Sequence, residues 1–130
     1  MIKNIITIAF ISISFFGFSQ KKELRSAQKL LDQSFFNEAL DVLSGIDNLI
    51  PNSDKKIQAQ YYYLLGWASK EDSKYNDAIK FLRKSIELDQ LEKYSENSLI
   101  LINNVEIDLV NSAVEDNKNN DFLNGAKKLY

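Results

Sequence analysis

The sequence predicts an all-α protein made of antiparallel helical hairpins that stack on one another. Apolar residues recur at the three- and four-residue spacing of a helix through most of the chain after residue 20. The polar breaks between these segments are short, so neighbouring helices must run antiparallel and touch. The 130 residues include four glycines and one proline, which are too few turn-forming residues for a many-stranded sheet. Together these features predict one helical domain over residues 20–130.

The clearest hairpin spans about residues 55–91. Its two apolar stripes are Tyr62, Leu65 and Ser69, then Tyr75, Ala78, Leu82 and Ile86. Between them, residues 70–74 are all polar and form the predicted turn. Gly66 lies inside the first helix, where glycine costs about 1 kcal/mol relative to alanine. Gly66 therefore predicts a close approach of the two helices.

A similar unit precedes this hairpin, at about residues 21–47. Residues 36–43 repeat residues 75–82 class by class, except that Asp41 stands against Lys80. The shared alanines, Ala39 and Ala78, are 39 residues apart. A loop with Pro51 follows the first unit, and Asn52, Ser53 or Asp54 is expected to cap the next helix.

A third hairpin is predicted over residues 95–130. Ser95 is the expected N-cap of a long helix from Glu96 to about Asn117, and a second helix restarts near Phe122. The apolar stripe of the long helix is broad, which predicts packing on two neighbours. Because the chain ends inside the last predicted helix, we expect it to be a fragment of a longer protein.

The central hairpin resembles the tetratricopeptide repeat, a family of helix–turn–helix units of about 34 residues. The matching positions are Tyr62, Leu65, Gly66, Tyr75, Ala78 and Leu82. The chain departs from the family pattern at Ser69, Ser85 and Gln90, where tyrosine, alanine and proline are usual. The resemblance implies a tetratricopeptide-like right-handed solenoid with a concave groove.

The resemblance also implies which residues line that groove. In the central unit they are Gln60, Tyr63, Trp67, Lys70 and Glu71. In the first unit they are Lys21, Leu24, Gln28, Leu31 and Asp32. The lysine–asparagine clamp for peptide carboxylates found in some relatives is absent, because Leu24 and Gln28 occupy its places. The third unit carries Ile107, Val110 and Val114, which predict core or a docking surface for another helix.

Residues 1–19 have the pattern of a cleaved export signal. Lys3 precedes an apolar run from Ile5 to Phe16, and Gly17-Phe18-Ser19 offers small residues at the sites that a signal peptidase reads. Cleavage would make Gln20 the new N-terminus. A permanent anchor is the alternative, but the run is shorter than the roughly 20 residues needed to span a bilayer. The sequence thus predicts a periplasmic or secreted protein with no membrane span after cleavage.

Composition argues against catalysis and cofactors. The chain has no histidine and no cysteine, which removes the commonest general base, the thiolate nucleophile and a lipoprotein anchor. The scattered glycines form no phosphate-binding loop. The adjacent carboxylates Glu71 and Asp72 lie in the polar break between two helices, where exposure to solvent accounts for them without a catalytic role. A net charge of −2 with interspersed signs argues against nucleic-acid binding. We therefore expect no enzyme activity, no metal and no cofactor.

These features favour an exported scaffold that binds a protein or peptide partner. Tyr63 and Trp67 would be buried by the partner, and Lys70 and Glu71 would fix its register. Packing of Trp67 against a neighbouring hairpin is an equally open interpretation. The alternative function is a regulatory or spacer segment of a larger cell-envelope protein whose activity lies beyond residue 130.

Overall fold

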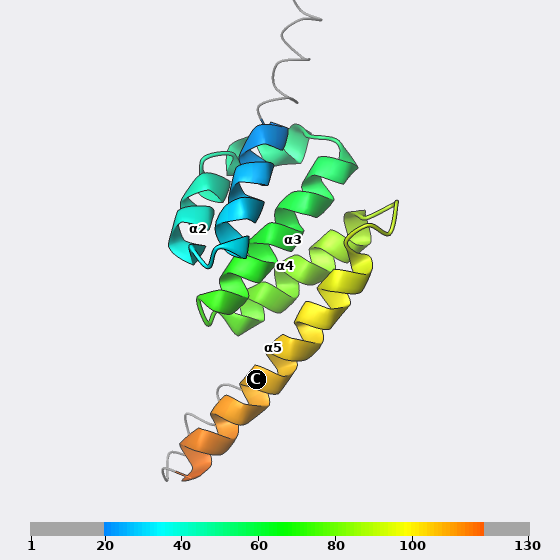
Figure 1. Ribbon diagram of the computed structural model, residues 1–130. Coiled ribbons are helices and arrows are strands. Elements are labelled where there is room, and N and C mark those ends of the chain that lie inside the picture. Colours follow the sequence, from blue (N-terminus) through cyan, green and yellow to red (C-terminus); the bar gives the residue numbers. More distant parts are fainter. Residues whose placement is uncertain (1–19, 119–130) are drawn as a thin grey trace, which may run out of the picture.

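The computed structural model describes residues 20–118, and within this range the chain is helical with no strand (Figure 1). The predicted all-α class is confirmed. The elements in order are a helix over residues 20–32, α2 (Phe36–Ser44), the 3-10 helix η1 (Asp47–Asn52), α3 (Lys55–Glu71), α4 (Tyr75–Leu88) and α5 (Ser95–Lys118). The predicted export signal and the second helix of the third hairpin lie outside the described residues.

The turns of the first two hairpins have the same backbone structure, 39 residues apart. Ser34 and Ser73 both take the left-handed conformation, with φ of 65° and 58°. In each turn the next amide, of Phe35 or Lys74, donates to the carbonyl five residues earlier at 2.9 Å. This bond closes the end of a helix whose last carbonyls lack helical partners. The repeat seen in the sequence is therefore a repeat of local structure.

Helices α3 and α4 pack closely along most of their length. A Cβ added to Gly66 would lie 2.6 Å from Cγ of Leu82, closer than real carbon atoms approach. Nearer the other end of the hairpin, the buried hydroxyl of Ser85 donates to the carbonyl of Ala59 at 2.7 Å. The close approach predicted from Gly66 is confirmed. The bond from Ser85 gives a reason for serine where the tetratricopeptide pattern has alanine.

Within the described residues, one apolar core joins helix 20–32, α2, η1 and α3 and reaches α4 and α5 through Leu82 and Ile102. Its fully buried members include Leu24, Leu43 and Leu64, and η1 contributes Ile50. The predicted loop around Pro51 is this 3-10 helix, which places Ile50 against the first two hairpins. Asp54 caps α3, since its carboxylate accepts a hydrogen bond from the amide of Ile57 at 2.9 Å.

The start of α5 differs from the prediction. Ser95 is already the first residue of the helix, and the capping carboxylate comes from Asp89, six residues earlier. Asp89 accepts hydrogen bonds from the amides of Lys93, Tyr94 and Ser95 and from the Ser95 hydroxyl. The prediction of Ser95 as N-cap was wrong because a carboxylate held by the preceding turn satisfies several amides that one hydroxyl cannot.

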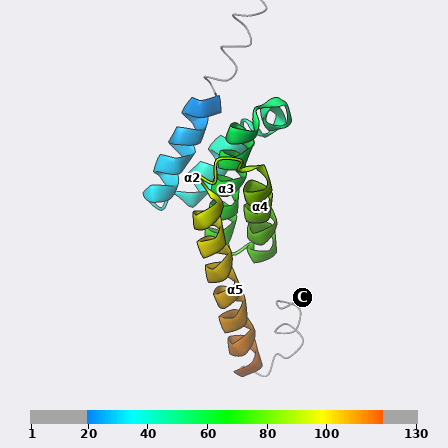
Figure 2. The same cartoon turned by 90° about the vertical axis from the view of Figure 1, so that its right-hand side faces the viewer.

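Helix α5 packs along α4, contacts α3, and extends well beyond both (Figures 1 and 2). Its buried residues are Ser98, Ile102, Val105 and Ala113. The apolar residues of α5 do meet two neighbours, α3 and α4, as predicted, but these two helices cover only one face of α5. The apolar residues on the other face remain exposed: Leu99, Ile100, Ile107, Val110 and Val114. None of the helices within residues 20–118 is long and apolar enough to cross a membrane.

Candidate functional site

Of the five groove residues expected in the central unit, Tyr63 is not available to a partner. Only 9% of its surface is exposed. Its ring packs on Tyr94, with centroids 5.3 Å apart, and on Trp67 at 6.2 Å. The expectation of an exposed Tyr63 was wrong because the connection between α4 and α5 folds back and places Tyr94 over it. Trp67 is half-buried and packs against the same core.

Burial also fixes the ionisation of the tyrosines in this region. Burial raises the pKa of the Tyr63 phenol above its usual value, and the nearby charge of Asp32 adds to the rise. The pKa of Tyr61 is raised to about 12, again mainly by burial and further by Asp47. Both phenols are neutral at physiological pH. They act as packing groups and are not suited to proton transfer or nucleophilic attack.

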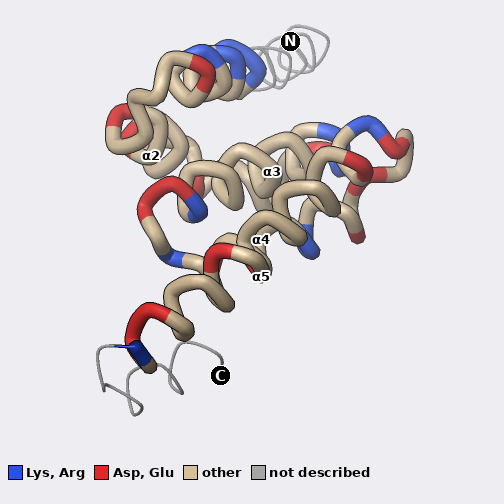
Figure 3. The backbone as a smooth tube through the Cα atoms, turned by 60° about the horizontal axis from the view of Figure 1, so that its bottom comes forward, with Lys and Arg blue, Asp and Glu red and all other residues tan. Residues whose placement is uncertain are grey.

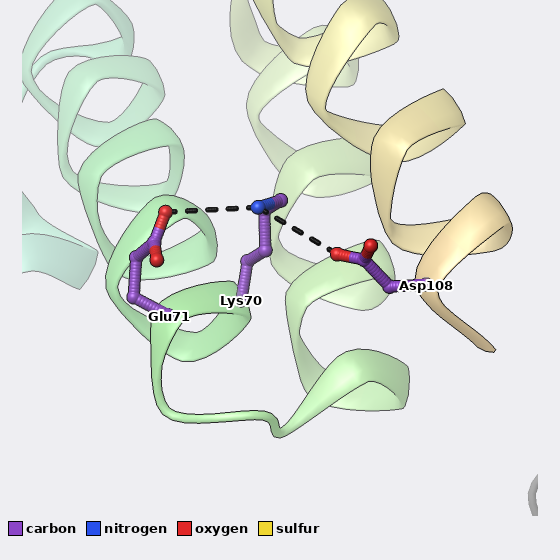
Figure 4. A network of polar contacts seen from close by, with 3 residues as sticks. All are labelled: Lys70, Glu71 and Asp108. Carbon is purple, nitrogen blue, oxygen red and sulfur yellow. Dashed lines mark ion pairs between the residues drawn. The ribbon is translucent and has the colours of Figure 1, made fainter. Parts of the chain in front are cut away.

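Lys70 and Glu71 form an ion pair and do not stand free in a groove. The Lys70 ammonium lies 3.6 Å from Glu71 and 3.7 Å from Asp108 on α5 (Figure 4). The Lys70 side chain is only 18% exposed, so its charge is directed at its own chain. The contact ties the end of α3 to the middle of α5. Partly exposed pairs of this kind contribute at most about 1 kcal/mol, so its main effect is to orient α5.

The groove residues expected in the first unit separate into two groups. Leu24 and Leu31 are buried in the core and cannot meet a partner. Their predicted groove position was wrong because helix 20–32 turns this face toward α2 and α3. Gln28 donates to Asp32 at 3.2 Å on the exposed side, and Lys21 is exposed.

Two of the open surfaces include residues that the sequence singled out. One is the exposed face of α5 with Ile107, Val110 and Val114, which were predicted to be core or a docking surface and are not core. The other is a cavity of about 180 Å³ where helix 20–32, α3 and the α4–α5 connection meet. It is lined by Lys21, Arg25, Lys56, Ile57, Gln60 and Lys93. Lys21 and Gln60 were expected here, but Arg25, Lys56 and Lys93 were missed.

No local pattern in the sequence marks those three basic residues. They lie on three segments that only the fold brings together, and each alone reads as an ordinary solvated charge. Within residues 20–118, no group of three or more acidic side chains is placed to hold a metal ion. Comparisons with protein-family models, with curated proteins and with solved structures gave no match to this chain.

Proposed function

We propose that this chain is an exported, tetratricopeptide-like helical scaffold that binds a protein partner and carries no catalysis of its own. The observation that carries the proposal is the exposed apolar face of α5, called the α5 stripe below. It consists of Leu99, Ile100, Ile107, Val110 and Val114, each 44–58% exposed. Contiguous apolar patches on a folded domain mark interaction sites more often than single exposed residues do.

The spacing within the α5 stripe indicates the kind of partner. Ile107, Val110 and Val114 follow one another at three and four residues, and Ile100 lies seven residues before Ile107. This is the a/d spacing with which one helix packs against another, with the exposed Asn103 at the d position between Ile100 and Ile107. From residue 100 to residue 114 the stripe runs about 21 Å at 1.5 Å per residue. That length suits a partner helix of about four turns.

The charges beside the α5 stripe specify the partner further. Glu106 and Glu115 are exposed next to it, and α5 as a whole carries Glu96, Glu106, Asp108, Glu115 and Asp116 against one lysine. Acidic residues lie along α5, and several basic residues lie close together on helix 20–32 (Figure 3). Two copies of α5 side by side would bring like charges together. The charge pattern favours a different protein, with an amphipathic helix whose apolar stripe is flanked by Lys and Arg.

Other features of the chain support a scaffold. The two hairpins share one turn structure, and the buried bond from Ser85 to Ala59 accounts for one departure from the tetratricopeptide pattern. The apolar run at residues 5–16 supports export. The absence of histidine and cysteine, together with the raised pKa of Tyr61 and Tyr63, supports a role without catalysis.

The test compares two double variants with the same change in charge. Ile107→Asp with Val110→Asp places two carboxylates on the α5 stripe, and Asn37→Asp with Asn48→Asp places two on exposed polar positions outside α5. The probe is a synthetic amphipathic helix with heptad leucines and lysine flanks, and binding is followed by fluorescence anisotropy. We expect the stripe variant to lose binding by tenfold or more and the control to change by less than threefold. Glutamate flanks in place of lysine should weaken binding to the natural chain.

Three results would overturn the proposal. A concentration-dependent dimer in light scattering that the stripe variant abolishes would make a second copy the occupant. The chain has no cysteine, so Val110→Cys is a single labelling site. Slow alkylation of this cysteine in the free protein would show that another part of the chain covers the stripe. Equal binding by the two double variants would also rule out the α5 stripe.

A further inference from the structure

The cavity beside helix 20–32 concentrates positive charge in a chain that is acidic overall. Its lining includes Lys21, Arg25, Lys56 and Lys93, and no acidic residue lines it. The ion pairs between described residues involve Lys70, Lys74 and Lys84, so none of them neutralises this group. All four residues are exposed, so solvent screens the repulsion between them, but their fields add in the space of about 180 Å³ that they line. An anion bound there would be attracted by all four charges.

The four cations come from three parts of the chain that the fold brings together. Lys21 and Arg25 are one turn apart on helix 20–32, and Lys56 lies in the first turn of α3. Lys93 is on the α4–α5 connection, where two contacts hold it. Its amide donates to Asp89 at 3.1 Å, and its ammonium lies 5.5 Å from the centre of the Tyr94 ring. Lys93 is therefore anchored by the turn that starts α5.

The rest of the lining completes a site for a polar group. Buried Ile57 forms an apolar floor, and the half-buried amide of Gln60 adds a neutral donor beside the cations. The volume of about 180 Å³ is well above the roughly 10–15 Å³ that a cavity needs to hold one water molecule. The space fits a small group with several acceptor oxygens.

We propose that this cavity binds a phosphate-type oxyanion, with Lys21, Arg25, Lys56 and Lys93 as its cationic contacts. A single carboxylate carries one charge and two oxygens in a plane, and would leave most of this positive charge uncompensated. A phosphate group carries up to about two charges at neutral pH and accepts hydrogen bonds on several sides. Cationic residues from three segments line the space, and an arginine fork with lysine point charges is a recurrent phosphate-binding combination. The site is separate from the α5 stripe and does not depend on its partner.

The same chemistry could come from a soluble phosphate compound or from a phospholipid head group, and two probes distinguish them. Inorganic pyrophosphate titrated in a calorimeter tests the soluble source. Flotation with vesicles of phosphatidylcholine, with or without phosphatidic acid, tests the lipid source. Both are done at constant ionic strength, because screening weakens all surface charges alike. We expect the natural chain to bind at least one probe with one-to-one stoichiometry per site.

Matched variants locate the binding. Lys21→Gln with Lys56→Gln removes two charges from the cavity, while Lys22→Gln with Lys55→Gln removes two from neighbouring exposed positions outside it. We expect the cavity variant to lose affinity about tenfold or more and the control less than twofold. Arg25→Lys should weaken pyrophosphate binding while keeping the charge, because the guanidinium fork is lost. Circular dichroism melting confirms that each variant is folded.

Several outcomes would overturn the assignment. Equal losses in the two double variants would mean general surface attraction. Binding of neither probe at millimolar concentration would mean that the cavity holds no phosphate. Binding of a glutamate-rich peptide with no competition from pyrophosphate would assign the cavity to an acidic protein segment instead.

Discussion

The first and second hairpins share their turns but differ at one buried position of the repeat. Gly66 in the second hairpin corresponds to Ala27 in the first, 39 residues earlier, and Leu82 corresponds to Leu43. All four residues are buried. The first hairpin therefore accommodates a Cβ where the second would place one 2.6 Å from Leu82. The repeat therefore carries a methyl group in the first hairpin at a position where the second hairpin leaves no room for one.

The largest change in stability is expected when Gly66 and Ala27 are each replaced by the residue that the other hairpin has. Gly66→Ala should destabilise the protein by about 2 kcal/mol, because α3 and α4 must move apart and the gain in helix propensity is smaller than the overpacking cost. Ala27→Gly should cost about 1 kcal/mol through helix propensity and a small void. Urea unfolding followed by circular dichroism measures both.

Gly45→Ala is the control for Gly66→Ala. Gly45 is exposed, with φ of −65° and nothing closer than 3.3 Å to an added Cβ, so alanine there should change stability by less than about 0.5 kcal/mol. A Gly66→Ala protein as stable as the natural chain would mean that Leu82 can move aside for a Cβ at Gly66 at little cost.

The hairpins also differ in how the chain leaves them. After the first, η1 anchors the connection with the buried apolar side chain of Ile50, whereas the second uses Asp89, 39 residues later. Burial alone would raise the pKa of Asp89, but the hydrogen bonds from Tyr94, Ser95 and Lys93 outweigh it and hold the pKa below its usual value. The first anchor is therefore insensitive to pH, and the second is sensitive to acid.

Asp89→Asn tests this difference. We expect a loss of about 1–2 kcal/mol at neutral pH, because a neutral amide replaces a carboxylate that accepts from several amides. A folded-state pKa below the unfolded value stabilises the protein above the usual pKa, near 4. That contribution disappears as the pH falls through the lowered folded-state pKa. The difference in free energy of unfolding between the natural chain and the Asp89→Asn variant should therefore become smaller below about pH 4.

Asp54→Asn serves as the comparison. Asp54 is an N-cap that bonds the single amide of Ile57, and asparagine caps almost as well. We expect a change of less than about 0.5 kcal/mol at neutral pH. If the loss of free energy of unfolding caused by Asp89→Asn stays constant from pH 7 to pH 2, the charge of Asp89 does not contribute to stability.

The sequence predicted what depends on neighbours along one helix, and missed what depends on distant segments. The first two hairpins, the approach at Gly66 and a cap among Asn52, Ser53 and Asp54 follow from spacing and residue type within a few turns. Tyr63 was expected to be exposed, yet Tyr94, 31 residues later, covers it. Helix periodicity cannot show how a connecting turn folds back. The basic cavity was missed for the same reason, since its cations come from three segments.

The smallest expected effect tests what the two hairpins have in common. Ser34 and Ser73 are exposed and hold φ of 65° and 58°, where a side chain costs about 1 kcal/mol or more and glycine costs little. Part of the stability gained by relieving this backbone strain is lost because glycine makes the unfolded chain more flexible. Ser34→Gly and Ser73→Gly should therefore each stabilise the protein by about 0.5 kcal/mol. The turns are distant from each other, so the double variant should show the sum. Unequal effects in thermal unfolding would mean that packing around the turns, and not their shared backbone, determines their stability.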